Sequence, residues 1–262
     1  MRLYYYFDPK LPGTAEDNVG VLEDILKNRR IKISRISKLN DPFDCQLGSL
    51  PEFSKEDIDY VRGKFAAIDD IMGMICFSAS VDNVLMWSHY AAHHKGFVLE
   101  IDVPYDYLVP IKYSSAVPEL FKGCCDCDNP YFKNAVFDIV RTKALDWAYE
   151  KEWRMFVPYS DNPHLQEEPK KDGTIVRFLK LDSCNVNICS VFIGLKCGMS
   201  PDRVAKLLHE SDFDKIAVYK MDQSLSGYSL SYLPCKTGEA YYKRQERIKS
   251  ALMELFRIKK TN

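Results

Sequence analysis

The sequence predicts one α+β domain built from an irregular mixture of strands and helices. Segments with strand character and segments with helical periodicity follow one another without a regular βαβ repeat, which does not favour a doubly wound parallel sheet. The chain has 262 residues, of which 46% are hydrophobic, and this is enough to form the core of one large domain. Because no Pro/Gly/Ser linker, low-complexity stretch or internal repeat divides it, we expect a domain at 1–235 followed by a basic amphipathic helix at 236–262.

The elements of the first hundred residues follow from hydrophobic periodicity and turn signals. An aromatic run at 3–7 has strand character, and apolar residues recur at helical spacing over 19–28. Pro42 forbids a helix through Asp41, so a turn is predicted at 40–44. Further strands are expected at 31–33, 74–77 and 97–101, and helices at 54–65 and 84–95.

The rest of the chain combines helices with a series of strands. Ser200 is a good N-cap before Pro201 at the first helical position, which predicts a helix over 200–208. A longer helix is expected at 132–147 and a last one at about 239–257, both from apolar residues that share a helical face. Strands are expected at 153–157, 174–179, 188–193, 216–219 and 228–233.

Charge and composition exclude several classes of protein. The 36 basic and 37 acidic side chains give a net charge of −1, which rules out a globally basic nucleic-acid coat but not a local basic patch. No Walker loop, G-x-G-x-x-G or G-x-S-x-G motif supports an ordinary kinase, NTPase, Rossmann enzyme or serine hydrolase. No apolar run approaches the roughly 18 residues of a membrane span, and the first residues lack a signal-peptide core. With nine scattered cysteines, typical of reduced thiols, we expect a cytoplasmic protein that does not contact a membrane.

Two segments raise the question of a metal or a nucleic-acid partner. Cys124, Cys125 and Cys127 have the wrong spacing for a paired C-x-x-C site, so a loop with exposed thiols is favoured over zinc. The last helix is basic and is suited either to nucleic-acid phosphates or simply to solvent. Its charged residues from 243 onward are Lys243, Arg244, Arg247, Lys249, Arg257, Lys259 and Lys260, against Glu246 and Glu254.

The segment 143–154 is the richest in chemistry. It is predicted to run from a helix into a strand, which places Glu150 and Glu152 at the start of that strand and on one face. Two carboxylates so close repel each other, which raises one pKa and suits acid–base or oxocarbenium chemistry. Arg154 would share that face and either offset the charge or bind an anionic substrate. A surface ion-pair ladder explains the same pattern equally well.

Three of the five histidines follow Trp87 closely. On a helix, His89 and His93 would share a face at a spacing that suits metal ligands. No Glu follows His89 as in the zinc-protease motif, so a structural histidine beside a core tryptophan is favoured. His89 can still act as a hydrogen-bond donor or a proton shuttle.

Five motifs in a fixed order resemble a known bacterial family. They are Asn40-Asp41-Pro42-Phe43-Asp44, Cys76-Phe77-Ser78, Met86-Trp87-Ser88-His89-Tyr90 with Gly96, Trp147-x-Tyr149-Glu150-Lys151-Glu152-Trp153-Arg154, and Ile193-Gly194. Over roughly 3–233, this arrangement resembles the bacterial family called domain of unknown function 2971. The family name implies no chemistry.

A more distant resemblance is to ADP-ribosyltransferases, including those of toxin–antitoxin and anti-phage systems. These enzymes have an opening strand, a helix ending near a turn, an aromatic-Ser strand and a late catalytic Glu entering a strand. The matching positions here are 4–7, 19–28, Phe77-Ser78 and Glu152. The first strand carries tyrosines where the superfamily usually has Arg or His, and Ala79 stands at the central Thr of its Ser-Thr-Ser pattern. The resemblance implies a mixed, mostly antiparallel split sheet flanked by helices.

The same resemblance implies NAD as a substrate, no metal, and transfer of ADP-ribose to a nucleic-acid or protein acceptor. Glu152 would stabilise the oxocarbenium-like state that forms as the nicotinamide–ribose bond breaks, and Glu150 would orient or deprotonate the acceptor. Arg154 or His89 would hold the pyrophosphate or a ribose hydroxyl. Tyr5, Phe43 and Trp87 would form aromatic walls that stack nicotinamide or adenine. The other residues expected to bind NAD are Tyr6, Asn40, Ser78 and Tyr90.

Two other classes of function fit the same residues. One is a non-catalytic module that binds a nucleotide, a nucleic acid or a protein. The other is a hydrolase or nuclease in which His89 and the two carboxylates handle phosphate chemistry, with or without a metal.

Overall fold

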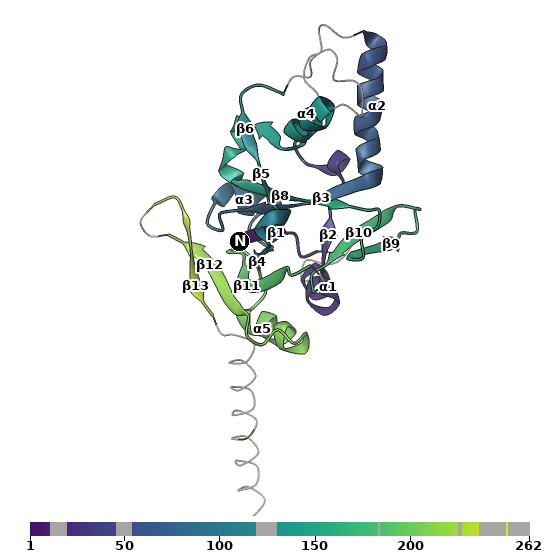
Figure 1. The fold of residues 1–262 in the computed structure, drawn as a ribbon. Helices are drawn as coiled ribbons and strands as arrows, with labels where there is room; N and C mark the ends of the chain where they lie inside the picture. Colours follow the sequence, from purple (N-terminus) through teal and green to yellow (C-terminus); the bar gives the residue numbers. More distant parts are fainter. Residues whose placement is uncertain are drawn as a thin grey trace, which may run out of the picture. The chain divides into compact units, whose positions relative to one another are not determined.

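The chain is an α+β protein of several helices and strands (Figure 1). It divides into two compact units. The computed structural model describes residues 1–10, 20–45, 54–118, 130–182, 184–224, 227–235 and 250. Unit 1 comprises Met1, Arg30–Ser80 and Val103–Val186, and unit 2 comprises Arg2–Arg29, Val81–Asp102 and the chain from Asn187 onward. The α+β class is confirmed, whereas a sheet of ADP-ribosyltransferase type and a single domain at 1–235 stay predictions. The expected helix at 239–257 and the cysteines at 124–127 lie outside the described residues.

Unit 2 contains a mixed, mostly antiparallel sheet. Its strands run in the order β13-β12-β11-β4-β1, and all pair antiparallel except β11 with β12. The ladder between β4 and β11 shifts register between Ile188 and Ser190, which marks a bulge. The strands are β1 (Arg2–Phe7), β4 (Phe97–Asp102), β11 (Asn187–Ile193), β12 (Ala217–Gln223) and β13 (Leu230–Pro234).

The core of unit 2 consists of apolar and aromatic side chains. Trp87 from α3 packs with Val98, Phe192 and Met221 from the sheet, and all four are almost completely buried. At the start of α5, Ser200 accepts a hydrogen bond from the backbone N–H of Arg203, as the N-cap prediction requires. The helices are α1 (Gly20–Asn28), α3 (Val84–Tyr90) and α5 (Pro201–Glu210).

Helix α3 ends earlier than the sequence predicts. The expected helix at 84–95 stops at Tyr90, and Ala92, His93 and His94 have φ values of 47°, 54° and 68°, in the left-handed region. The turn is closed by the backbone N–H of Gly96, which donates to the carbonyl of Ala91 at 2.8 Å. His89 and His93 therefore do not share a helical face, and the metal-ligand spacing inferred from a continuous helix is wrong.

Unit 1 combines three small groups of strands. Strand β8 pairs antiparallel with both β3 and β5, while β10 pairs antiparallel with β2 and β9. The short strands β6 and β7 pair parallel with each other and form a separate ladder. The strands are β2 (Arg30–Ile33), β3 (Met72–Ser78), β5 (Val109–Pro110), β6 (Lys112–Ser114), β7 (Thr142–Ala144), β8 (Glu152–Pro158), β9 (Leu165–Pro169) and β10 (Ile175–Lys180).

The helix expected at 132–147 is broken in the structure. Unit 1 has α2 (Lys55–Ile71) and α4 (Pro130–Val140), and the chain leaves α4 to form β7 and then a 3₁₀ helix, η3 (Leu145–Glu150). The backbone N–H of Lys112 donates a hydrogen bond of 2.8 Å to the carbonyl of Arg141, next to the paired strands β6 and β7. Tertiary strand pairing thus overrides the apolar helical periodicity of this segment.

Candidate functional site

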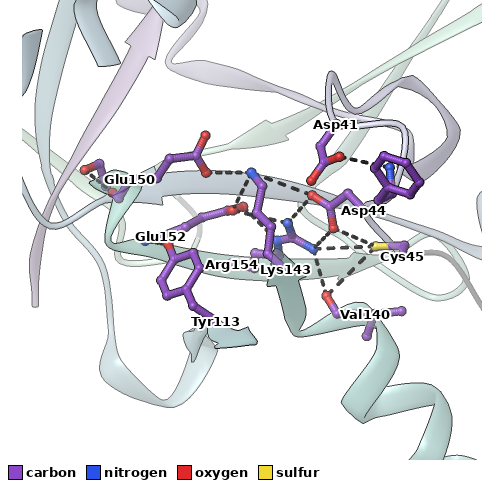
Figure 2. Close-up of polar contacts among 11 residues, drawn as sticks. Asp41, Asp44, Cys45, Tyr113, Val140, Lys143, Glu150, Glu152 and Arg154 are labelled. Atoms are coloured by element: carbon purple, nitrogen blue, oxygen red, sulfur yellow. Dashed lines mark hydrogen bonds and ion pairs between the residues drawn. The ribbon is translucent and has the colours of Figure 1, made fainter. Parts of the chain in front are cut away.

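Five charged side chains gather in the interior of unit 1 and form the buried charge cluster (Figure 2). None of them is more than 6% exposed. They come from the turn after Asn40, from β7, from the end of η3 and from the start of β8. The members are Asp44, Lys143, Glu150, Glu152 and Arg154.

Arg154 is the centre of the cluster and is completely buried. Its Nε donates to Glu152 Oε1 at 2.7 Å and its Nη2 reaches Glu152 Oε2 at 3.2 Å. The same guanidinium holds Asp44 by two bonds of 3.0 and 2.5 Å, and Nη1 also donates to the carbonyl of Val140 at 2.8 Å and to Cys45 Sγ. All guanidinium donors are thus engaged inside the protein, so Arg154 offsets carboxylate charge here and has no donor left for an anionic substrate.

Lys143 bridges the two carboxylates of the E-x-E motif. Its Nζ lies 2.5 Å from Glu150 Oε2, 3.2 Å from Glu152 Oε2 and 3.8 Å from Asp44 Oδ2. Burial by itself would lower the pKa of Lys143, but the charges of Glu152 and Glu150 raise it above the ordinary value. The sequence did not single out Lys143 as part of the site, because the residue fell within the predicted helix at 132–147.

Glu152 is ionised in this environment. Burial would raise its pKa, but the charge and hydrogen bonds of Arg154, together with the charge of Lys143, lower it to about 2. The prediction that repulsion from Glu150 raises a pKa is therefore wrong for Glu152. The main reason is the guanidinium of Arg154, and the ammonium of Lys143, which lies within 3.2 Å of both carboxylates, adds to its effect.

The backbone around the two carboxylates is fixed by several contacts. Glu150 ends η3, Lys151 has a left-handed φ of 47°, and Glu152 begins β8, so strand alternation is not what brings the carboxylates together. Ser78 is the antiparallel partner of Glu152, and its hydroxyl donates to the carbonyl of Glu150 at 2.6 Å. The backbone N–H of Glu152 donates to the Tyr113 hydroxyl at 2.7 Å. These contacts restrict the movement of the whole E-x-E segment.

Two thiols adjoin the cluster without acting as nucleophiles. Burial raises the pKa of Cys45 to about 12, and burial also raises that of Cys76 well above its ordinary value. Both thiols are therefore protonated at neutral pH, which is the unreactive form. Among the residues that the structure describes, no group of three or more His, Cys, Asp or Glu side chains is arranged to hold a metal ion.

The turn before Asp44 exposes the side chain of Phe43 and buries that of Asp44. The backbone N–H of Phe43 donates to Asp41 Oδ1 at 2.9 Å, and that of Asp44 donates to the carbonyl of Asp41 at 3.1 Å. This turn leaves the Phe43 ring 70% exposed while Asp44 is buried against Arg154. Asn40, which precedes it, is exposed.

The remaining residues predicted to bind NAD belong to unit 2. Trp87 is completely buried, its indole N–H donates to the carbonyl of Val81 at 2.6 Å, and its ring meets that of Tyr6 edge-on at 5.5 Å. With no exposed ring surface, Trp87 belongs to the hydrophobic core and does not form the stacking wall predicted for it. His89 and Tyr90 have their rings 6.1 Å apart, and Tyr5 stacks on Phe7 at 5.8 Å.

Unit 1 also has a pocket, of about 390 Å³, along β8. Its walls include Met155, Val157, Asp106 and His164, and no member of the buried charge cluster lines it. The cluster is thus an interior charge network in this structure, and its chemistry must be argued from its own contacts.

Comparison with known proteins adds no homologue to these observations. No protein-family model, no curated protein and no solved structure matches this chain. Among the described residues, no helix is both long enough and apolar enough to cross a membrane. The resemblance to the domain of unknown function 2971 family stays a prediction.

Proposed function

We propose that this protein is an ADP-ribosyltransferase-like enzyme that cleaves the nicotinamide–ribose bond of NAD. The observation that supports the proposal best is the pairing of Ser78 with Glu152 on the adjacent strands β3 and β8. These are the two positions at which the sequence resembles the aromatic-Ser strand and the late catalytic Glu of that superfamily. Residues 74 positions apart on the chain thus lie opposite each other on paired strands, which supports a shared site.

The electrostatics of Glu152 suit the role of stabilising a ribosyl cation. An oxocarbenium-like state is stabilised by an ionised carboxylate, and a pKa of about 2 keeps Glu152 ionised at any physiological pH. Its Oε2 atom makes two contacts, with Arg154 and Lys143, and both are 3.2 Å long, near the upper limit of a normal hydrogen bond. We place the ribose 2′-hydroxyl of NAD at this oxygen, where it replaces the contact with Lys143.

Glu150 is assigned to the acceptor. It holds Lys143 more closely than Glu152 does, at 2.5 against 3.2 Å, so it can retain the ammonium when substrate binds to Glu152. The acceptor is a nucleic acid or a protein, and the enzyme acts in the cytoplasm as a toxin or an anti-phage effector. The free cysteines among the described residues agree with a reducing compartment.

One observation favours a second candidate, a non-catalytic binding module. Glu152 is only 6% exposed and Arg154 is not exposed at all, and their charges are satisfied by one another and by Asp44 and Lys143. Such a network is also what a purely structural buried ion cluster looks like. A measurement of NAD cleavage distinguishes the two candidates.

The test is nicotinamide release from NAD by the purified protein, with and without cell lysate, in the wild type and in Glu152→Gln. We expect turnover to fall by about 100-fold or more, since this is the usual cost of removing one preorganised electrostatic group. Dependence of the release on lysate would indicate a macromolecular acceptor. Glu167→Gln is the matched control, because Glu167 is a half-exposed glutamate of the same unit that pairs with Arg177 at 2.6 Å.

Glu152→Gln also removes charge from a buried network, so folding must be measured beside activity. Thermal unfolding and circular dichroism of both variants separate a lost catalyst from a lost fold. Nicotinamide release at the wild-type rate by a folded Glu152→Gln protein would contradict the assignment. No release and no NAD-induced thermal shift in the wild type would remove the transferase proposal and leave the binding module.

A further inference from the structure

The turn after α3 borders a pocket in unit 2 that the proposed function does not use. The pocket has a volume of about 660 Å³, within the range of small-molecule sites. It lies between His94, the Leu195-Lys196 segment after β11, and residues of the β12–β13 hairpin. None of its lining residues belongs to the buried charge cluster.

The turn that carries His94 is strained and tightly held. Three successive residues without glycine, Ala92 to His94, have left-handed φ values, a conformation that proteins keep mainly at functional sites. The backbone N–H of His94 donates to the carbonyl of Trp87 at 3.0 Å, and its carbonyl accepts from the N–H of Lys196 at 2.9 Å. A Cβ on Gly194 would lie only 2.3 Å from the His94 carbonyl oxygen, so this close approach requires glycine.

The polar side of the pocket suits an anion. Lys196 is exposed and is the charged residue among the described residues that line the pocket. Ser229 and Gln223 also line the pocket and carry a hydroxyl and an amide as further donors. His94 lines the same pocket, and its buried Nδ1 has no hydrogen-bond partner within the described part of the chain.

The other side of the pocket suits a planar ring. Tyr228, near the tip of the hairpin, is fully exposed, whereas Leu195 and Leu230 beside it are partly or almost completely buried. A fully exposed tyrosine that lines the same pocket as these leucines offers a face on which an aromatic ligand can stack.

We propose that this pocket binds a 5′-mononucleotide, with the phosphate at Lys196 and the base between Tyr228 and the apolar floor. The site is independent of the proposed cleavage of NAD, because it uses residues of unit 2 alone. A nucleotide at this site would act as a second ligand of the protein and not as the substrate cleaved at Glu152.

The test is calorimetric titration of the full chain with three probes, 5′-AMP, adenosine and inorganic phosphate. We expect 5′-AMP to bind more tightly than either fragment, because only the nucleotide uses both walls. Tyr228→Ala and Lys196→Gln should each weaken 5′-AMP binding by at least about fivefold, the lower end of the cost of losing one stacking ring. The matched controls are Tyr60→Ala on α2 and Lys206→Gln on α5, both exposed residues outside the pocket.

Both test residues lie on the surface, so their variants should keep the wild-type melting temperature, which is measured first. Absence of saturable 5′-AMP binding would overturn the proposal, as would unchanged affinity in folded Tyr228→Ala and Lys196→Gln. Inorganic phosphate or adenosine binding as tightly as 5′-AMP would overturn the mononucleotide assignment. Glu152→Gln should retain full 5′-AMP affinity, which separates this proposal from the proposed function.

Discussion

Unit 1 and unit 2 both bury apolar side chains, but among the described residues only unit 1 also buries a cluster of charges. In unit 1, five charged side chains occupy buried positions and satisfy one another through ion pairs of 2.5 to 3.8 Å. In unit 2, Trp87 and Phe192 are instead buried in a core of apolar side chains. An apolar core loses stability in proportion to the volume removed, whereas a buried ion cluster fails when one member leaves its partners unpaired. The two units should therefore respond differently to charge-changing variants and to pH.

The largest effect is expected from Arg154→Met. The substitution leaves Asp44 and Glu152 buried and deprived of the guanidinium that holds each of them by two hydrogen bonds. Removal of one partner of a buried ion cluster costs about 3–5 kcal/mol of the free energy of unfolding. Hydrogen exchange followed by mass spectrometry should show the loss of protection in β3 and β8, with β4 and β11 of unit 2 less affected.

The control for this variant is Arg141→Met in the same unit. Arg141 pairs with Asp138 one helical turn away and its side chain is 36% exposed, so its loss should cost at most about 1 kcal/mol. Equal protection of β8 in the two variants would show that the cluster is not what stabilises unit 1.

The second effect is acid sensitivity confined to unit 1. Glu152 has a pKa of about 2 in the folded protein against an ordinary value of 4.5, so folding favours its ionised form. This contribution is fully present above pH 4.5 and is lost as the pH falls toward 2, and it amounts to about 3 kcal/mol. Urea unfolding at pH 6, 4 and 3, read by hydrogen exchange, should show unit 1 weakening first.

Glu152→Gln supplies the matched measurement for this pH dependence. The variant cannot gain stability from ionisation at this position, so its free energy of unfolding should vary less between pH 6 and pH 3. A wild type and a variant with parallel pH profiles would place the acid sensitivity elsewhere.

The sequence predicts well those elements whose signal lies within their own segment. The strands at 3–7, 74–77 and 97–101 and the helix at 200–208 were found within a few residues, because each carries an apolar pattern or a cap of its own. The helix at 132–147 failed, since β7 forms by pairing with β6 some 30 residues earlier. A pattern within one segment contains no information on such a partner.

The site likewise combines residues that are neighbours in sequence with residues that only the fold brings together. Glu150, Glu152 and Arg154 were found because they are neighbours in sequence, and the structure brings them together. Lys143 and Asp44 were not recognised as their counter-charges, since Asp44 is 110 positions from Arg154 and Lys143 fell in a supposed helix. Net charge and spacing cannot reveal which of 36 basic side chains is buried. The contacts of Glu152 with Arg154 and Lys143, moreover, lower its pKa in spite of its burial.

The smallest effect on stability is expected from Phe43→Ala. This variant tests an exposed aromatic residue of unit 1, in contrast to the buried Trp87 of unit 2. The sequence predicted stacking roles for both Phe43 and Trp87, but Phe43 is 70% exposed and Trp87 is fully buried. Phe43→Ala should change the free energy of unfolding by no more than about 0.5 kcal/mol, because the Asx turn of Asp41 uses only the backbone of residue 43. If the ring stacks on NAD, KM for NAD should rise about two- to tenfold with kcat unchanged, which is the signature of lost uniform binding. A fall in kcat, or unchanged kinetics in the folded variant, would exclude this binding role and leave Phe43 a solvent-facing residue of the turn.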